Sequence, residues 1–138
     1  MSTSMTDINI ADVLLPLDRI PITSAKTIFK ESIERMGKFN LGILSITDDN
    51  GKLIGIITDG DIRRIILKSQ KPFAALFADD SILHANTSPL CVQLDSKVSD
   101  AIDIMEDNEI WDLPVIDQVG HLVGLLHLHP IVKSMMDG

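Results

Sequence analysis

The chain repeats itself once, and this repeat constrains the fold more than any other feature of the sequence. Residues 29–66 align with residues 98–135 at a constant shift of 69 positions, without a gap. The matched positions share glycine, aspartate or an apolar side chain: Ile33 and Ile102, Met36 and Met105, Asp48 and Asp117, Gly51 and Gly120, Leu53 and Leu122, Gly55 and Gly124, Ile62 and Ile131. Two glycines and an aspartate in phase with an apolar frame indicate a duplicated structural unit.

The first copy predicts a strand, a helix, a hairpin of two strands and a second helix. Pro21 to Thr23 form a short extended piece before a helix that starts at residues 24–27, with Gly37 as its C-terminal cap. The apolar positions of that helix recur at helical spacing: Ile28, Phe29, Ile33 and Met36. The strands span residues 41–47 and 52–57 around an Asp-Asp-Asn-Gly turn, and the second helix spans residues 59–67.

The second copy repeats this plan, with helices over residues 94–108 and 130–136 and hairpin strands over residues 111–116 and 121–126. In the segment between the copies, Phe73, Leu76 and Phe77 are expected to face inward. The chain therefore divides into a first unit of residues 11–68, a connecting segment of residues 69–88 and a second unit of residues 89–138. We expect an α/β (α+β) fold of two β-α-β-β-α units. So few strands cannot bury both sheet faces alone, so the units are expected to pack as a pseudo-two-fold pair with clefts between their sheets.

Composition excludes several functional classes. The 138 residues carry a net charge of −8, which argues against non-specific binding to nucleic acid or to anionic membranes. Cys91 is the only cysteine, so neither an intrachain disulfide nor a cysteine zinc cluster can form. No apolar stretch approaches the roughly 20 residues of a membrane span, and residues 1–10 do not resemble a signal peptide. We expect a cytoplasmic protein.

The run Gly-Ile-Ile-Thr-Asp-Gly-Asp-Ile-Arg-Arg over residues 55–64 resembles a CBS domain. In that family the returning strand ends in Gly-x-x-Thr-x-x-Asp at the start of the second helix. Together with Asn-Leu-Gly at residues 40–42 and the Gly-Leu-Leu-His-Leu-His ending at residues 124–129, the chain is similar to the C-terminal CBS pair of D-arabinose 5-phosphate isomerases. Those enzymes belong to the pathway to the lipopolysaccharide sugar Kdo. Their chemistry resides in an N-terminal sugar isomerase (SIS) domain, to which nothing here corresponds, so we expect no enzymatic activity from this chain alone.

The motif itself predicts a ligand site. Thr58 and Asp61 bracket the first turn of a helix, where backbone N–H groups and the helix dipole attract anions. The Asp61 carboxylate can accept hydrogen bonds from both hydroxyls of a ribose, Gly60 permits close approach of the backbone, and the arginines supply cations. The resemblance implies apolar walls from the two neighbouring strands. The candidate ligand-binding residues are Ile22, Gly42, Ile43, Thr58, Asp59, Gly60, Asp61, Arg63, Arg64, His127 and His129. A capping box, in which Thr58 and Asp61 only satisfy backbone donors, explains the same two side chains.

The second copy departs from the subfamily pattern, because Pro130 stands where an aspartate usually follows the His-x-His ending. His127 and His129 are candidates for binding a phosphate or carboxylate, with structural histidines as the alternative. A metal site is not expected, since His121 or His84 would have to supply a third ligand through folding. No catalytic residue and no cofactor are predicted, and Trp111 is expected to be a packing residue.

The leading hypothesis is a regulatory CBS pair that binds an adenine nucleotide or a cytidine sugar nucleotide such as CMP-Kdo. Its expected partners are an SIS catalytic domain, in cis or in trans, and a second copy joined through the CBS helices. One rival is a ligand-free oligomerisation module. Another is the CBS pair of a sugar-phosphate nucleotidyltransferase, a family that shares Thr-Asp-Gly-Asp-Ile-Arg-Arg but matches less well because of the His-x-His ending here.

Overall fold

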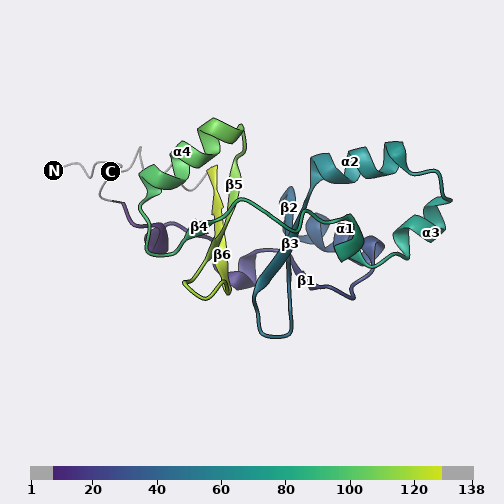
Figure 1. The fold of residues 1–138 in the computed structure, drawn as a ribbon, viewed down its shortest axis with the longest axis horizontal. Coiled ribbons are helices and arrows are strands. Elements are labelled where there is room, and N and C mark those ends of the chain that lie inside the picture. Colours follow the sequence, from purple (N-terminus) through teal and green to yellow (C-terminus); the bar gives the residue numbers. More distant parts are fainter. Residues whose placement is uncertain (1–7, 129–138) are drawn as a thin grey trace. The chain divides into compact units, whose positions relative to one another are not determined.

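The computed structural model describes residues 8–128, and it confirms the mixed α/β fold class (Figure 1). The chain forms two compact units. One consists of Arg19–Pro89, and the other combines residues 8–18 with residues 90–128. Each unit has its own three-stranded sheet and its own hydrophobic core.

The Arg19–Pro89 unit contains the first copy of the repeat. Its strands are β1 (Ile22–Ser24), β2 (Ile43–Thr47) and β3 (Leu53–Thr58), and its helices are α1 (Phe29–Phe39), α2 (Asp59–Lys68) and α3 (Phe73–Phe77). A 3-10 turn, η4 (Ser81–His84), follows α3. The central strand β2 pairs in parallel with β1 and antiparallel with β3. The segment between the copies is therefore partly helical and contributes Leu76 to this core.

The other unit contains the second copy in the same arrangement. It consists of a 3-10 turn η2 (Ile10–Asp12), β4 (Val92–Gln93), α4 (Val98–Asn108), β5 (Asp112–Ile116) and β6 (Leu122–His127). Strand β5 pairs in parallel with β4 and antiparallel with β6. The helix predicted for residues 130–136 lies outside the described residues. Within residues 8–128, no helix has the length and apolar character needed to cross a membrane.

Helix α1 differs from the sequence prediction at both ends. A turn in which the Thr27 amide donates to the Ser24 carbonyl, at 3.1 Å, delays the helix until Phe29. Ile28 therefore precedes the helix and is exposed, so its predicted core position is wrong. The C-terminal cap is Asn40, in the left-handed conformation with φ of 54°, and Gly37 lies inside the helix. Asparagine tolerates that conformation better than most residues, so no glycine is needed there.

The core of the first unit lies on one face of its sheet. Leu44, Ile46 and Ile57 alternate with residues of the opposite face and are fully buried. They pack against Phe29 of α1 and Leu76 of α3. The predicted inward orientation of Phe73 is wrong, because this side chain is 59% exposed at the first turn of α3. Trp111, expected to pack, is also exposed.

Each sheet is extended at its free edge by the segment that precedes the opposite copy of the repeat. Asn86, which precedes the second copy, exchanges two backbone hydrogen bonds with Ile56 of β3, at 2.9 and 3.0 Å. Leu15, which precedes the first copy, does the same with Leu125 of β6, at 2.8 and 3.0 Å. The crossing segments satisfy backbone groups that an open edge would leave unpaired. The pairing of Leu15 with Leu125 also explains why residues 8–18 belong to the same compact unit as the second copy.

Candidate functional site

The candidate site of the first unit lies where β3 passes into α2. Thr58 pairs with Ile43 of β2, and Ile22 of β1 pairs with Ser45, two residues further along β2. Because paired residues and every second residue of a strand share a face, Ile22, Ile43 and Thr58 lie on one face of the sheet. This is the face opposite to Leu44 and the helix-covered core. The structure therefore places three of the predicted residues on a common surface.

Thr58 and Asp61 form a reciprocal capping box at the N-terminus of α2. The Asp61 amide donates to Thr58 Oγ1 at 3.2 Å, and the Thr58 amide donates to Asp61 Oδ2 at 2.9 Å. The other carboxylate oxygen, Oδ1, forms an ion pair with Arg64 one turn later. The capping role that the sequence left open is thus present.

Capping leaves both side chains with further hydrogen-bonding capacity. An ionised carboxylate has about four acceptor positions, and Asp61 uses one on each oxygen within the described residues. The Thr58 hydroxyl accepts one bond and still has its proton to donate. The Asp61 side chain is 24% exposed. The geometry is therefore compatible with a capping role and a ligand-binding role at once.

Gly42 and Asp59 are in contact beside this motif. The Asp59 amide donates to the Gly42 carbonyl at 3.0 Å, and a Cβ on Gly42 would lie 2.7 Å from Asp59 Oδ2. The glycine therefore permits the carboxylate to lie against the backbone. Gly42 and Asp59 line a hollow of about 320 Å³ together with residues of α1. Gly60 is less constrained, since a Cβ there would make only an ordinary contact, 3.4 Å from the exposed end of Arg64.

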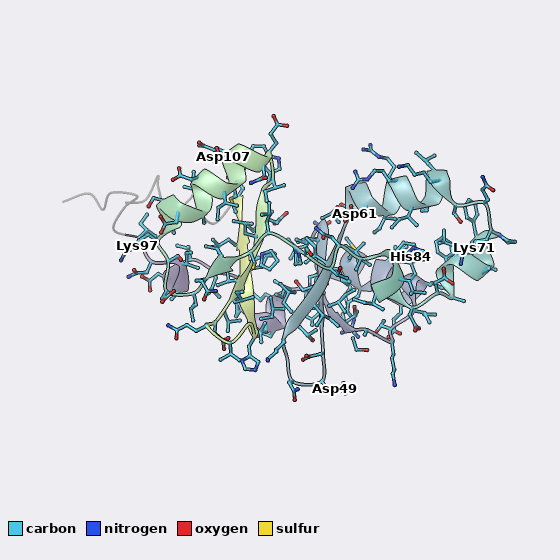
Figure 2. All side chains as sticks on the ribbon, viewed as in Figure 1. Asp49, Asp61, Lys71, His84, Lys97 and Asp107 are labelled. Atoms are coloured by element: carbon cyan, nitrogen blue, oxygen red, sulfur yellow. The ribbon has the colours of Figure 1, made fainter. Side chains whose placement is uncertain are left out.

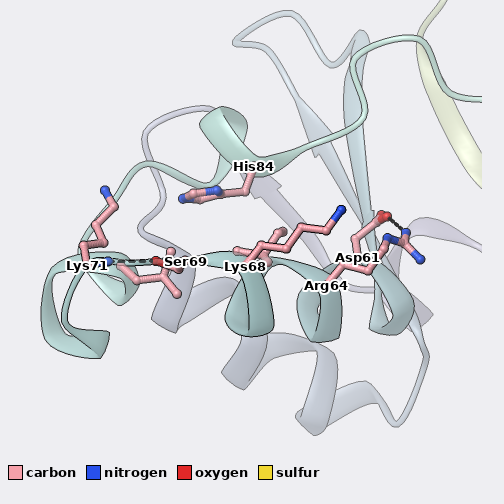
Figure 3. Close-up of a pocket in the computed structure, with 8 residues that line it drawn as sticks. Asp61, Arg64, Lys68, Ser69, Lys71 and His84 are labelled. Atoms are coloured by element: carbon pink, nitrogen blue, oxygen red, sulfur yellow. Dashed lines mark hydrogen bonds and ion pairs between the residues drawn. The ribbon is translucent and has the colours of Figure 1, made fainter.

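The two arginines of the motif have different surroundings. Arg64 contacts Asp61, and both line a second pocket of about 390 Å³ along α2 (Figure 3). Arg63 is exposed and lines neither hollow. Helical spacing accounts for the difference, because residues three apart share a face and consecutive residues do not. The structure thus brings Arg64, and not Arg63, to the predicted site.

His127 belongs to the other unit, where it ends β6 and pairs with Asp112 of β5. Its Nδ1 lies 2.7 Å from Asp112 Oδ1. At the repeat shift of 69, His127 and Asp112 occupy the positions of Thr58 and Ile43. Sequence reasoning missed Asp112. The predicted hairpin of residues 111–126 places the strand that begins near Asp112 beside the strand that ends near His127, and this was the available signal. His129 and Pro130 lie outside the described residues.

Metal ligands do not converge in the part of the chain that the structure describes. No group of three or more histidine, cysteine, aspartate or glutamate side chains there could hold an ion. His84 and His121 each approach one aspartate instead, Asp79 and Asp117. Cys91 is partly buried, and burial raises the pKa of its thiol, which disfavours a reactive thiolate.

Comparison with known proteins agrees with this geometry. The CBS domain family matches residues 10–68 and 80–136, one match for each copy of the repeat. The chain belongs to the CBS domain family. Arabinose 5-phosphate isomerase KdsD of Pseudomonas aeruginosa is 28% identical to this CBS chain over 127 residues, which are 92% of this chain and 38% of that protein. The predicted similarity to such an isomerase is confirmed. The chain spans 35–38% of the length of the first curated relatives it matches.

Solved CBS pairs share the fold. The crystal structure of CBSX2 in complex with AMP has a TM-score of 0.82 and 22% identity, and the match covers 94% of this chain and 97% of that one. The same protein has been solved from Arabidopsis thaliana. The CBS domain pair of protein MJ0100, in complex with 5′-methylthioadenosine and S-adenosyl-L-methionine, has a TM-score of 0.73 and 25% identity over 94% of this chain and 96% of that one.

Proposed function

We propose that this chain is a regulatory CBS pair that binds a ribonucleotide at the junction of β3 and α2. The observation that carries the proposal is the arrangement of Thr58 and Asp61, which cap the helix while keeping hydroxyl and carboxylate capacity for a ligand. Asp61 would accept from the ribose hydroxyls, and Ile22 and Ile43 of the same sheet face would contact the base. Thr58 would donate to a phosphate oxygen.

An adenine nucleotide is the first ligand to consider. Solved CBS pairs of the same fold are described in complex with AMP and with two other adenosine derivatives. The similarity to arabinose 5-phosphate isomerase supports a second candidate, the cytidine sugar nucleotide CMP-Kdo, as a feedback signal in lipopolysaccharide biosynthesis. Both ligands carry a ribose with two hydroxyls, so the role of Asp61 is the same for either.

Regulation would work by a population shift. The Arg64 guanidinium forms an ion pair with the carboxylate that would hold the ribose. A ligand that accepts hydrogen bonds from this arginine, or displaces it from Asp61, favours one arrangement of the start of α2. That preference would be transmitted to an SIS isomerase domain, in cis or in trans, as a coupling free energy between the two sites. The chain itself would carry out no chemistry.

The test is calorimetric titration of AMP, ADP, ATP, CMP-Kdo and S-adenosylmethionine into the protein and its Asp61→Ala variant. Loss of the contacts to the ribose costs about 1–3 kcal/mol, so the variant is expected to bind roughly tenfold or more weakly. The same nucleotide with a 2′-deoxyribose is expected to lose affinity for the wild type and little further for the variant.

Asp100→Ala is a matched control for the loss of a helix cap. At the N-terminus of α4, the Lys97 amide donates to Asp100 Oδ2 at 3.1 Å, as Thr58 does to Asp61. Both variants are expected to lose about 1 kcal/mol of stability, but only Asp61→Ala should lose nucleotide affinity. Equal affinities in the two variants would remove Asp61 from the site.

A ligand-free oligomerisation module is the competing function. Leu67, Phe73 and Leu83 are 77%, 59% and 71% exposed, all within the Arg19–Pro89 unit, and exposed apolar side chains of this kind favour association. This alternative predicts a homodimer whose melting temperature does not respond to any nucleotide of the panel. Saturation of a real site at about 100 times its Kd would instead stabilise the fold by about 2.7 kcal/mol.

A further inference from the structure

Besides Arg64, the 390 Å³ pocket along α2 contains cations that the proposed nucleotide contacts do not use. Arg64 and Lys68 of α2, Lys71 of the following turn and His84 of η4 line it (Figure 3). Figure 2 shows Asp61 at the start of α2 and Lys71 beyond its other end. Seven residues separate Asp61 from Lys68, which corresponds to about 10 Å along a helix. Most of the pocket therefore lies a full turn or more beyond the Thr58–Asp61 motif.

The positive charges of this pocket are only partly neutralised. Arg64 pairs with Asp61, while Lys71 Nζ and His84 Nε2 share one oxygen of Asp79, at 2.6 and 2.9 Å. Lys68 is in no ion pair within residues 8–128. Three permanent cations thus face two carboxylates, in a protein whose overall charge is −8. The local excess of positive charge is suited to an anion.

The remaining surface of the pocket is apolar. Ile65 and the buried Leu76 line it between the cations. The volume lies within the range of small-molecule sites, and a mixture of apolar surface with a few charged groups is typical of them. We propose that this pocket is a separate binding site for a small phosphate monoester, with the phosphate at Lys68 and Arg64, whose ends lie on the same side of the pocket in Figure 3, and a compact organic group against Ile65 and Leu76.

The helix dipole sets the character of such a site. Lys68 is the last residue of α2, and the Ser69 amide donates back to the Ile65 carbonyl at 2.9 Å. A helix C-terminus presents carbonyls and partial negative charge, so backbone amides of α2 contribute nothing to anion binding there. The phosphate would depend on side-chain cations alone. Affinity is therefore expected to fall steeply with salt, because exposed charges are screened.

The test is a titration of the ¹⁵N-labelled 138-residue chain with phenyl phosphate, at constant ionic strength maintained with sodium chloride. The amides of Ser69 and Lys71 are expected to shift, and inorganic phosphate should bind more weakly because it cannot contact the apolar surface. Lys68→Gln should weaken phenyl phosphate binding about tenfold, the effect of losing one charged hydrogen bond. Lys68→Arg should retain most of the affinity, because it keeps the charge.

Lys38→Gln is the control, since Lys38 is exposed in the last turn of α1 and does not line this pocket. It should bind phenyl phosphate as the wild type does. An equal loss in both glutamine variants, or no loss in Lys68→Gln, would overturn the site. AMP affinity should stay within about twofold of wild type in Lys68→Gln, and a larger loss would overturn the separation from the nucleotide site. Failure of AMP to bind at all would count against the proposed function and leave the phenyl phosphate result intact.

Discussion

Replacing Gly124 with alanine tests whether the crossing segment is an essential part of the second unit. A Cβ at this position would lie 2.6 Å from the Leu15 carbonyl oxygen and 2.6 Å from Leu14 Cδ1. The Leu14 side chain can rotate away, but the carbonyl is backbone and is held by its hydrogen bond from the Leu125 amide, at 3.0 Å. The added methyl group must therefore push the segment off the edge of β6.

The magnitude follows from this geometry. Overpacking costs about 1–3 kcal/mol, and weakening two backbone hydrogen bonds adds about 1 kcal/mol or more. The lower backbone entropy of unfolded alanine offsets roughly 0.5–1 kcal/mol. We expect Gly124→Ala to lose about 2–3 kcal/mol of unfolding free energy, whereas Gly55→Ala should lose less. At Gly55 the nearest contacts of a Cβ are side-chain carbons at 3.1 and 3.3 Å, with the Asn86 carbonyl at 3.4 Å.

Equilibrium urea unfolding followed by circular dichroism measures these differences, and hydrogen exchange at the Leu125 amide gives the local readout. Gly37→Ala is the control of opposite sign, because Gly37 lies in the last turn of α1 and nothing lies within 4 Å of a Cβ there. It should stabilise the protein by about 0.5–1 kcal/mol. The reasoning is refuted if Gly124→Ala is as stable as Gly37→Ala, or if Gly55→Ala is the more damaging of the two strand substitutions.

Two further predictions concern charge and backbone conformation. Hydrogen bonds from Lys71 and His84 hold the pKa of Asp79 below its ordinary value of 3.8, so the ionised carboxylate contributes stability above pH 3.8 that is lost as the pH falls through the lower folded pKa. Asp79→Asn should be less stable than wild type at about pH 6, and the difference between the urea midpoints should shrink as the pH falls below 3.8; a constant difference would contradict this assignment. Glu109 caps α4 in the left-handed conformation, with φ of 53°, so Glu109→Gly should raise the unfolding free energy by about 0.5–1 kcal/mol in the same assay, and an unchanged or lower value would count against conformational strain there.

The parts of the fold that depend on residues close together in the sequence were predictable. Each hairpin turn is held by the side chain of an aspartate, which explains why Asp48 and Asp117 recur at the repeat shift. Asp48 Oδ1 accepts from the amides of Asn50 and Lys52, both at 2.9 Å, and Gly51 has the positive φ, 85°, that such a turn requires. The ends of helix α1 were predicted less well. A helix start depends on whether a preceding turn or the helix itself takes the first amides, and apolar spacing does not distinguish these.

The crossing segments could not be predicted, because a backbone pairing between distant residues leaves no periodic pattern. Leu15 and Asn86 are recognisable only by their partners across the sheet edge. The candidate site likewise has parts that the sequence predicts and parts that it does not. The capping motif is local, and so is the contact of Arg64 with Asp61, which are three residues apart on a helix. The position of His84 beside the same helix depends on the path of the chain through α3, for which the sequence contains no signal.

The two copies of the repeat show which positions the fold requires and which are open to change. Gly55 and Gly124 lie under the crossing segments, and their replacement has a steric cost in both units. The pairs three residues further along each hairpin share a register but differ in chemistry: the first unit has Ile43 and Thr58, and the second has Asp112 and His127. A hydroxyl beside an apolar side chain is suited to a ligand, whereas an aspartate and a histidine 2.7 Å apart satisfy each other. Within residues 8–128, the second copy therefore retains the framework of a CBS unit but pairs an aspartate with a histidine where the first copy has Ile43 and Thr58. The hydrogen-bonding capacity left on Thr58 and Asp61 supports the proposal that the first copy binds the ligand.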